Sequence, residues 1–164
     1  MTNSKITIRP AGESDYTAIN SLYQQSYQLL HKNLPESFKP TPIVALSRGD
    51  FLNEIESKEV LAIVAEVNKK VVGHLYAYVD DYAGDEVATG YHRVEIGELY
   101  GLPEMSRQGV GTMLMQEAEK WAKKLKITDL AVLTYDYNKE AISFYEANGY
   151  KQYSIKLEKK ITKE

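Results

Sequence analysis

The sequence contains no cysteine among its 164 residues. A chain without thiols can form no disulfide, no cysteine zinc site and no thiolate nucleophile. This composition suits a reducing compartment, and we expect a cytoplasmic protein.

An excess of charge of one sign and long apolar runs are also missing. The 20 Lys and Arg residues nearly balance the 23 Asp and Glu residues, which gives a formal net charge of -3. A general nucleic-acid binder carries a basic excess. No apolar run approaches the roughly 18 residues that a membrane span needs, and the polar, alternating residues 1–10 do not resemble a signal peptide. We therefore expect neither nucleic acid nor membrane as a partner.

The residues that are present predict a folded globular protein. The chain is 43% hydrophobic and 26% charged, and its length suits one domain over residues 1–164. The proline-rich residues 33–42 predict an irregular connector, and the acidic residues 80–90 predict a surface loop. Alternating or β-branched runs predict strands, and apolar residues at steps of three and four predict helices. The strands are expected at residues 5–9, 60–67, 71–79, 91–102, 129–136 and 150–157, and the helices at residues 16–30, 49–57, 110–125 and 139–148. Their order indicates a mixed α/β sheet.

A glycine-containing turn lies where a predicted strand gives way to a predicted helix, at residues 107–112. Glycine lets the backbone approach a bulky anion, and the unpaired N–H groups of a helix N-terminus then point at that anion. A pyrophosphate suits this geometry best, although two glycines can also simply permit a tight turn. Two rival phosphate motifs fit poorly, because the P-loop needs a Lys followed by Ser or Thr after its last glycine, and the dinucleotide fingerprint needs a small residue in place of Leu114.

Two segments resemble the GNAT superfamily of acetyl-CoA-dependent N-acetyltransferases. Residues 106–111 are similar to the family motif [Gln/Arg]-x-x-Gly-x-[Gly/Ala], although Ser106 replaces the usual Arg or Gln, and Gly101 stands where many members carry a β-branched residue. Residues 138–150 are similar to the family's Asn-x-x-Ala-x-x-Phe-Tyr-x-x-x-Gly-Phe/Tyr segment, and they follow the first motif across one predicted strand.

This resemblance implies a fold and an activity. The fold would be α/β (α+β), with a mixed, mostly antiparallel central sheet flanked by helices and an acetyl-CoA site at a splayed pair of central strands. The activity would be transfer of the acetyl group from acetyl-CoA to an amine of a small molecule, peptide or protein, by direct attack in a ternary complex. The chemistry calls for no metal. The positions that the resemblance assigns to acetyl-CoA are Leu99, Tyr100, Gly101, Arg107, Gln108, Gly109, Val110, Gly111, Thr112, Asn138 and Ala141.

The resemblance also assigns a proton donor. It places Tyr145 at the departing thiolate, where a phenol can donate a proton as the thiolate forms. The alternative is that Tyr145 packs in the core, as we expect for its neighbour Phe144.

The general base is left open between Glu95 and Glu98, on the strand before the glycine turn. Residues three apart face opposite sides of a regular strand, but a bulge at Gly97 would change that parity. We favour Glu95 by its spacing to the turn, while a chain of water, His74 or His92 are alternatives.

The acceptor site is indicated only weakly. Residues 23–51 are expected to form one wall of the acceptor groove. An acidic and aromatic segment could receive a cationic amine, although a solvated loop beside ordinary strand aromatics is the simpler interpretation. Its members are Tyr76, Tyr78, Asp80, Asp81, Tyr82, Asp85, Glu86 and Tyr91.

Two functions of other classes stay open at this point. One is a catalytically silent CoA-binding sensor or interaction module, and the other is a protein that binds a different phosphate ligand. The sequence sets no oligomeric state, and a homodimer is one of the open alternatives.

Overall fold

The computed structural model describes residues 5–40, 44–159 and 161. The chain divides into two compact units, Met1–Leu133 and Thr134–Glu164. The first unit carries a sheet and three helices, and the second carries one helix and an irregular segment. The expectation of one domain over residues 1–164 stays a prediction. No helix in the described ranges is long and apolar enough to cross a membrane.

The first unit is built on a five-stranded sheet with the order β1-β2-β3-β4-β5. All neighbouring strands are antiparallel except β4 and β5, which are parallel. This confirms the mixed, mostly antiparallel sheet. The strands are β1 (Thr7–Pro10), β2 (Val60–Val67), β3 (Lys70–Gly84), β4 (Thr89–Gly101) and β5 (Leu130–Val132).

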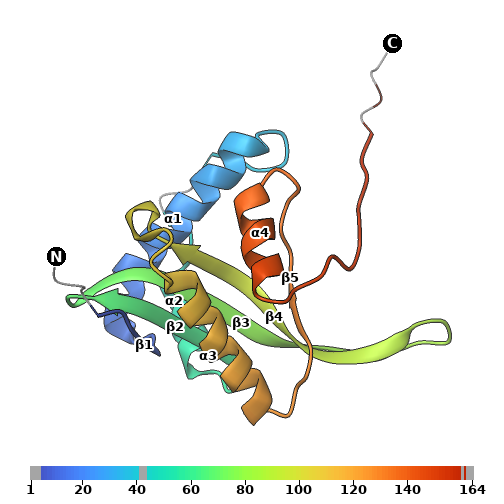
Figure 1. The fold of residues 1–164 in the computed structure, drawn as a ribbon, viewed down its shortest axis with the longest axis horizontal. Helices are drawn as coiled ribbons and strands as arrows, with labels where there is room; N and C mark the ends of the chain where they lie inside the picture. The colour runs from blue at the N-terminus through green and yellow to red at the C-terminus, as the bar shows by residue number, and fades with distance from the viewer. Residues whose placement is uncertain (1–4, 41–43, 160, 162–164) are drawn as a thin grey trace. The chain divides into compact units, whose positions relative to one another are not determined.

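The helices of the first unit lie on both faces of this sheet (Figure 1). They are α1 (Tyr16–Asn33), α2 (Arg48–Glu56) and α3 (Val110–Lys124), with short 3-10 turns at η1 (Glu13–Asp15) and η2 (Pro103–Met105). On β3, the His74 ring packs at a tilt against the ring of Tyr23 in α1, with 4.7 Å between centroids, whereas the neighbouring Gly73 lies against Val110 of α3. Because successive strand residues point to opposite faces, α1 and α3 cover different faces of the sheet.

The strands β3 and β4 form a longer hairpin than the sequence predicts. Residues 80–90 were expected as a loop, but strand pairing continues to the partners Gly84 and Thr89, and Figure 1 shows this arm projecting beyond the rest of the sheet. The loop is confined to residues 85–88, and the prediction was wrong for the residues on either side of it, because acidic residues and glycine indicated a loop over the whole segment. Across the arm, Asp80 lies 2.9 Å from Arg93 and Asp81 contacts His92 Nδ1, so polar cross-strand pairs stabilise the hairpin.

The second unit begins its helix α4 (Lys139–Ala147) at Asn138, whose Oδ1 accepts a hydrogen bond of 3.1 Å from the N–H of Ala141. Gly149 has a φ of +89° just after the helix, the left-handed conformation that glycine commonly adopts at a helix C-terminus. The strand predicted at residues 150–157 is absent: residues 151–159 are irregular and exposed. Alternation supplies a two-faced segment, but a strand also needs a neighbour to pair its backbone, and no pairing is present there.

The remaining boundaries are close to expectation. The connector is irregular from Leu34 to Pro40, while Pro42 lies outside the described residues. The strand expected at residues 129–136 is shorter, because only Leu130–Val132 pair with β4.

Candidate active site

The glycine turn forms an open cradle at the start of α3. Gly109 is the N-cap of α3 with a φ of +88°, and Arg107 is also left-handed with a φ of 60°. A Cβ added to Gly109 would meet nothing within 4 Å, no side chain caps the helix, and its first turn holds no acidic residue. The N–H groups of the first turn, including that of Gly111, have no acceptor within the helix. Residues 107–112 therefore present backbone donors that suit a bound anion.

The strand β4 has an open edge beyond its pairing with β5. The parallel pairing covers only residues 94–96 of β4, so residues 97–101 of β4 have no partner on β5. The N–H of Leu102 donates to the carbonyl of Val72 on β3 at 2.8 Å. Antiparallel alternation then turns Tyr100 toward β3 as well, and it turns the N–H groups of Leu99 and Gly101 toward the open edge.

These two features adjoin one another. Val110 Cγ1, in the first turn of α3, lies 3.6 Å from the position of a Cβ on Gly101. The open edge of β4 therefore leads directly to the cradle. An extended amide-containing arm suits such an edge, and a pyrophosphate suits such a cradle, so the residues fit acetyl-CoA.

A bulge at Gly97 brings Glu95 and Glu98 to one face of the sheet. Tyr78 pairs with Glu95 and Tyr76 with Glu98, so β4 uses one residue more than β3 between these pairs. Tyr76 and Tyr78 are two apart on β3 and share a face, and so do their partners. The structure thus confirms the bulge that the sequence allowed.

Glycine is required at the bulge because aromatic rings cover it. A Cβ on Gly97 would lie 2.7 Å from Cδ1 of Tyr76 and 3.3 Å from Cε1 of Tyr78. The two rings are 5.8 Å apart between centroids. They form an aromatic surface beside the two glutamates.

The two glutamates have different surroundings. Glu95 Oε2 lies 3.3 Å from Arg93 Nη2 without forming a hydrogen bond. Burial raises the pKa of Glu95, and the nearby Arg93 opposes that rise. Burial also raises the pKa of Glu98, against a smaller opposite effect of a hydrogen bond with Ser26. Among the described residues no Lys or Arg forms an ion pair with Glu98.

Helices α1 and α2 complete this surface with residues that face Glu98. Burial raises the pKa of the Tyr23 and Tyr27 phenols, and the charges of Glu98 and Glu54 raise them further. Both carboxylates therefore lie close to these two phenols. Tyr23 is within the wall expected from the sequence, but Glu54 was missed. Its signal was its spacing, since it lies three residues after the buried Phe51 on the same side of α2.

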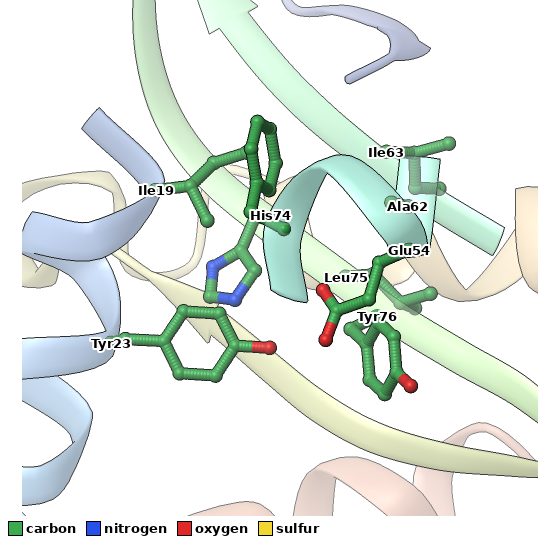
Figure 2. A pocket seen from close by; sticks show the side chains of 9 residues that line it. Ile19, Tyr23, Glu54, Ala62, Ile63, His74, Leu75 and Tyr76 are labelled. Atoms are coloured by element: carbon green, nitrogen blue, oxygen red, sulfur yellow. The ribbon is translucent and has the colours of Figure 1, made fainter. Parts of the chain in front are cut away.

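His74 lies in the interior beneath α1. Its side chain is 2% exposed, and neither ring nitrogen has a hydrogen-bond partner. Burial lowers its pKa from the ordinary 6.5 to about 3, so the ring is neutral near pH 7. Figure 2 shows its imidazole with Tyr23, Tyr76 and the Glu54 carboxylate around one small cavity.

The three aspartates of the β3–β4 arm, Asp80, Asp81 and Asp85, have partners within the arm. Asp80 pairs with Arg93, and Asp81 pairs with His92. The Asp85 carboxylate accepts hydrogen bonds from Tyr82 and from two backbone N–H groups, and these bonds lower its pKa to about 2. This pattern favours the simpler interpretation of the arm as a structural hairpin.

The remaining predicted site residues lie in the second unit. Tyr145 is half-buried on α4, with its ring centroid 5.4 Å from that of Phe144 and 5.6 Å from that of Tyr150. Asn138 and Ala141 form the helix cap described above. Within the part of the chain that the structure describes, no group of three or more His, Cys, Asp or Glu residues could hold a metal ion.

A family model of the acetyltransferase (GNAT) family matches residues 18–150. The chain belongs to the GNAT acetyltransferase family. This GNAT protein is accordingly an N-acetyltransferase, and its family implies the use of acetyl-CoA.

This GNAT protein is similar to other proteins in sequence and in fold. It is 24% identical over 147 residues to the uncharacterized N-acetyltransferase YhfO of Bacillus subtilis, covering 90% of this chain and 91% of the relative. Its fold is similar to that of the BH1408 protein from Bacillus halodurans, with a TM-score of 0.87, 17% identity, and coverage of 94% of this chain and 99% of the other. It is also similar to an aminoglycoside 6'-N-acetyltransferase from Acinetobacter baumannii, with a TM-score of 0.70, 19% identity, and coverage of 96% and 100%.

Proposed function

We propose that this GNAT enzyme acetylates a primary amine of a small molecule or peptide by direct attack in a ternary complex, with Glu98 as the general base. The observation that carries the proposal is the bulge at Gly97. It sets Glu98 on the face shared with Tyr76 and Glu95, one residue before Leu99, whose N–H faces the open edge of β4.

Acetyl-CoA supplies an acetyl group on a thioester. The backbone of residues 107–112 would hold its pyrophosphate, and Leu99 and Gly101 would pair with its pantetheine arm. Their N–H groups are also suited to stabilise negative charge on the carbonyl oxygen. Asn138 and Ala141 would contribute from the second unit, as the family motif implies.

Glu98 suits proton acceptance better than Glu95. An amine attacks only in its neutral form, and a free alkylammonium has a pKa near ~10.4, so a base must take its proton. Burial raises the pKa of Glu98, and no cation opposes that rise, whereas Arg93 opposes it at Glu95. A carboxylate with a raised pKa is a stronger base. Glu95 would then help to attract the acceptor.

The atoms balance in one transfer. The ammonium form of the acceptor first gives one proton to Glu98, which passes it to water. The neutral amine nitrogen then forms a bond to the acetyl carbon, the carbon–sulfur bond breaks, and the nitrogen gives a second proton to Glu98. The sulfur takes a proton from the hydroxyl of Tyr145. Both protein groups then return to their starting state by exchange with water.

The test compares Glu98→Gln with Glu95→Gln in an acetyl-transfer assay over a range of pH. We expect Glu98→Gln to lose most activity near pH 6 to 7 and to recover as the pH approaches the ~10.4 of a free amine, because solvent then supplies the neutral form. Glu95→Gln should keep the shape of the parent profile. Binding of CoA without turnover of any amine would instead indicate a silent CoA-binding module.

A further inference from the structure

The small cavity beneath α1 contains polar groups without partners. Its lining includes His74 and Tyr76 of β3, Tyr23 of α1 and Glu54 of α2. Both ring nitrogens of His74 are buried and unbonded. In Figure 2 the imidazole, the Tyr23 phenol and the Glu54 carboxylate are turned toward one another. A buried ring nitrogen without a hydrogen bond is unfavourable, so a ligand that donates a hydrogen bond to the acceptor nitrogen is favoured there.

The charge of the cavity is negative and is not neutralised by the protein. Among the described residues no Lys or Arg forms an ion pair with Glu54. The nearby charge that bears on its pKa is the like charge of Asp50, which adds to the effect of burial. His74 is neutral near pH 7 and offers a lone pair rather than a competing positive charge. The cavity is therefore suited to a cation that donates hydrogen bonds.

The size of the cavity selects the kind of cation. Its volume is about 10 Å³, close to the minimum that a single water molecule needs. A primary ammonium group is about as large as a water molecule, so it fits. A guanidinium, a trimethylammonium or a sugar ring does not.

The cavity also lies next to the proposed base. Tyr76 lines the cavity, and its cross-strand partner on β4 is Glu98. Side chains of such partners are about 5 Å apart at Cβ. A short aliphatic chain therefore spans from the cavity to Glu98.

We propose that the acceptor of this enzyme is a slim aliphatic diamine, whose far ammonium group is held in the cavity between His74 and Glu54 while its near amine is acetylated beside Glu98. This inference rests on the proposed function for the near amine alone. Glu54 is thereby a specificity-determining residue, and the enzyme discriminates by the second charge and by the size of the group that carries it.

The decisive experiment compares three acceptors that share the same reacting amine. They are diaminobutane, butylamine, and the diaminobutane derivative with three methyl groups on one nitrogen. We expect kcat/KM for diaminobutane to exceed that for each of the others by about tenfold or more, which is the scale of a charge-assisted hydrogen bond. Equal values for diaminobutane and butylamine would overturn the proposal.

Two variants on α2 distinguish binding of the ammonium group in the cavity from a general effect of removing a negative charge. Glu54→Gln should lower kcat/KM for diaminobutane about tenfold. Its kcat/KM for butylamine should stay within about twofold of the parent value. Glu56→Gln removes an exposed charge two residues away, and it should change neither value. An equal loss on both amines in Glu54→Gln would show that Glu54 acts on the fold or on the shared reaction, and the proposal would be wrong.

A binding measurement keeps this test independent of turnover. Diaminobutane should raise the melting temperature of the parent and of Glu56→Gln but not that of Glu54→Gln, and butylamine should raise none of them. If no amine is acetylated while this pattern holds, the proposed function fails and the cation site stands. If diaminobutane shifts none of the proteins, the cavity holds water only and the inference falls.

Discussion

Removal of the Tyr145 hydroxyl tests the proposed role of this residue as the proton donor to the thiolate. Tyr145→Phe keeps the ring that lies beside Phe144 and Tyr150, so stability should change little. Loss of a general acid costs about 10²- to 10⁴-fold in rate, and we expect kcat to fall toward the lower end because a thiolate is a good leaving group. The affinity for CoA should move much less, since the hydroxyl acts as charge develops on sulfur.

Steady-state kinetics with purified, folded protein measure this effect, and Tyr150→Phe is the matched control because it removes a hydroxyl from the neighbouring ring. A rate for Tyr145→Phe within about twofold of the parent would make Tyr145 a packing residue, with water protonating the thiolate.

His74 gives the fold a dependence on pH. Its pKa is about 3 in the folded protein because of burial, against an ordinary 6.5. Between pH 6.5 and pH 3, His74 is protonated in the unfolded chain but stays neutral in the folded protein. The free energy of unfolding therefore falls as the pH decreases over this range. From pH 7 to pH 5 this effect amounts to about 2 kcal/mol of unfolding free energy. Denaturant titration of the parent and of His74→Leu at both pH values measures it. The variant should lose about 2 kcal/mol less than the parent over this range, and equal losses in the two proteins would contradict the burial of a neutral ring.

At the scale of elements, the start of α3 is positioned by a glycine on the neighbouring strand. A Cβ on Gly73 would lie 2.8 Å from Val110 Cγ1 and 3.1 Å from the carbonyl oxygen of Tyr100, whereas a Cβ on Gly101 would lie 3.6 Å from the same Val110 atom. Gly73→Ala should therefore push α3 away and destabilise the protein by about 1–3 kcal/mol, while Gly101→Ala should cost less than about 1 kcal/mol. Thermal unfolding of the pair checks this difference. Equal melting temperatures for the two variants would mean that α3 can shift to make room for the Cβ of Gly73→Ala without a loss of stability.

Local sequence signals predicted the elements that depend on local geometry. Asn68 and Lys69, with φ values of 50° and 63°, form the tight turn between β2 and β3, two strands that the β-branched runs predicted. Gly97 marked the bulge, and Gly109 marked the helix start. Gly109 takes a positive φ that favours glycine, whereas Gly97 leaves room for the rings of Tyr76 and Tyr78, so in both cases the glycine itself marked the irregular position.

Features that depend on distant partners were not predictable in this way. The alternation at residues 150–157 indicated a strand, but pairing depends on a neighbour that the segment itself does not encode. The acidic arm was expected as a loop because the cross-strand partner of Asp80, Arg93, lies 13 residues further along the chain. Glu54 became part of the candidate site only once α2 was seen to bring it near Tyr23 and Glu98.

At the scale of the whole molecule, the distribution of charge matters more than its sum. The formal net charge of -3 is small, yet Glu54, Glu95 and Glu98 gather on one face of the sheet. The backbone donors at Gly109 and Gly111 lie at the start of α3, whose first turn holds no acidic residue. The fold thus separates a surface suited to a cationic amine from a cradle suited to an anionic pyrophosphate.

The cradle can be tested through the stability of the entire protein. A ligand at about 100 times its Kd stabilises the folded state by about 2.7 kcal/mol, which for a chain of this size raises the melting temperature by about 5–10 °C. Gly111→Val places a branched side chain in the first turn of α3 without requiring an unusual φ, and valine has no lower helix propensity than glycine. The variant should keep the melting temperature of the free parent and lose the shift that CoA induces. Gly109→Ala is the informative contrast, because a φ of +88° strains any other residue and should lower the melting temperature of the free protein as well. A folded Gly111→Val protein with an undiminished CoA shift would place the pyrophosphate away from residues 107–112.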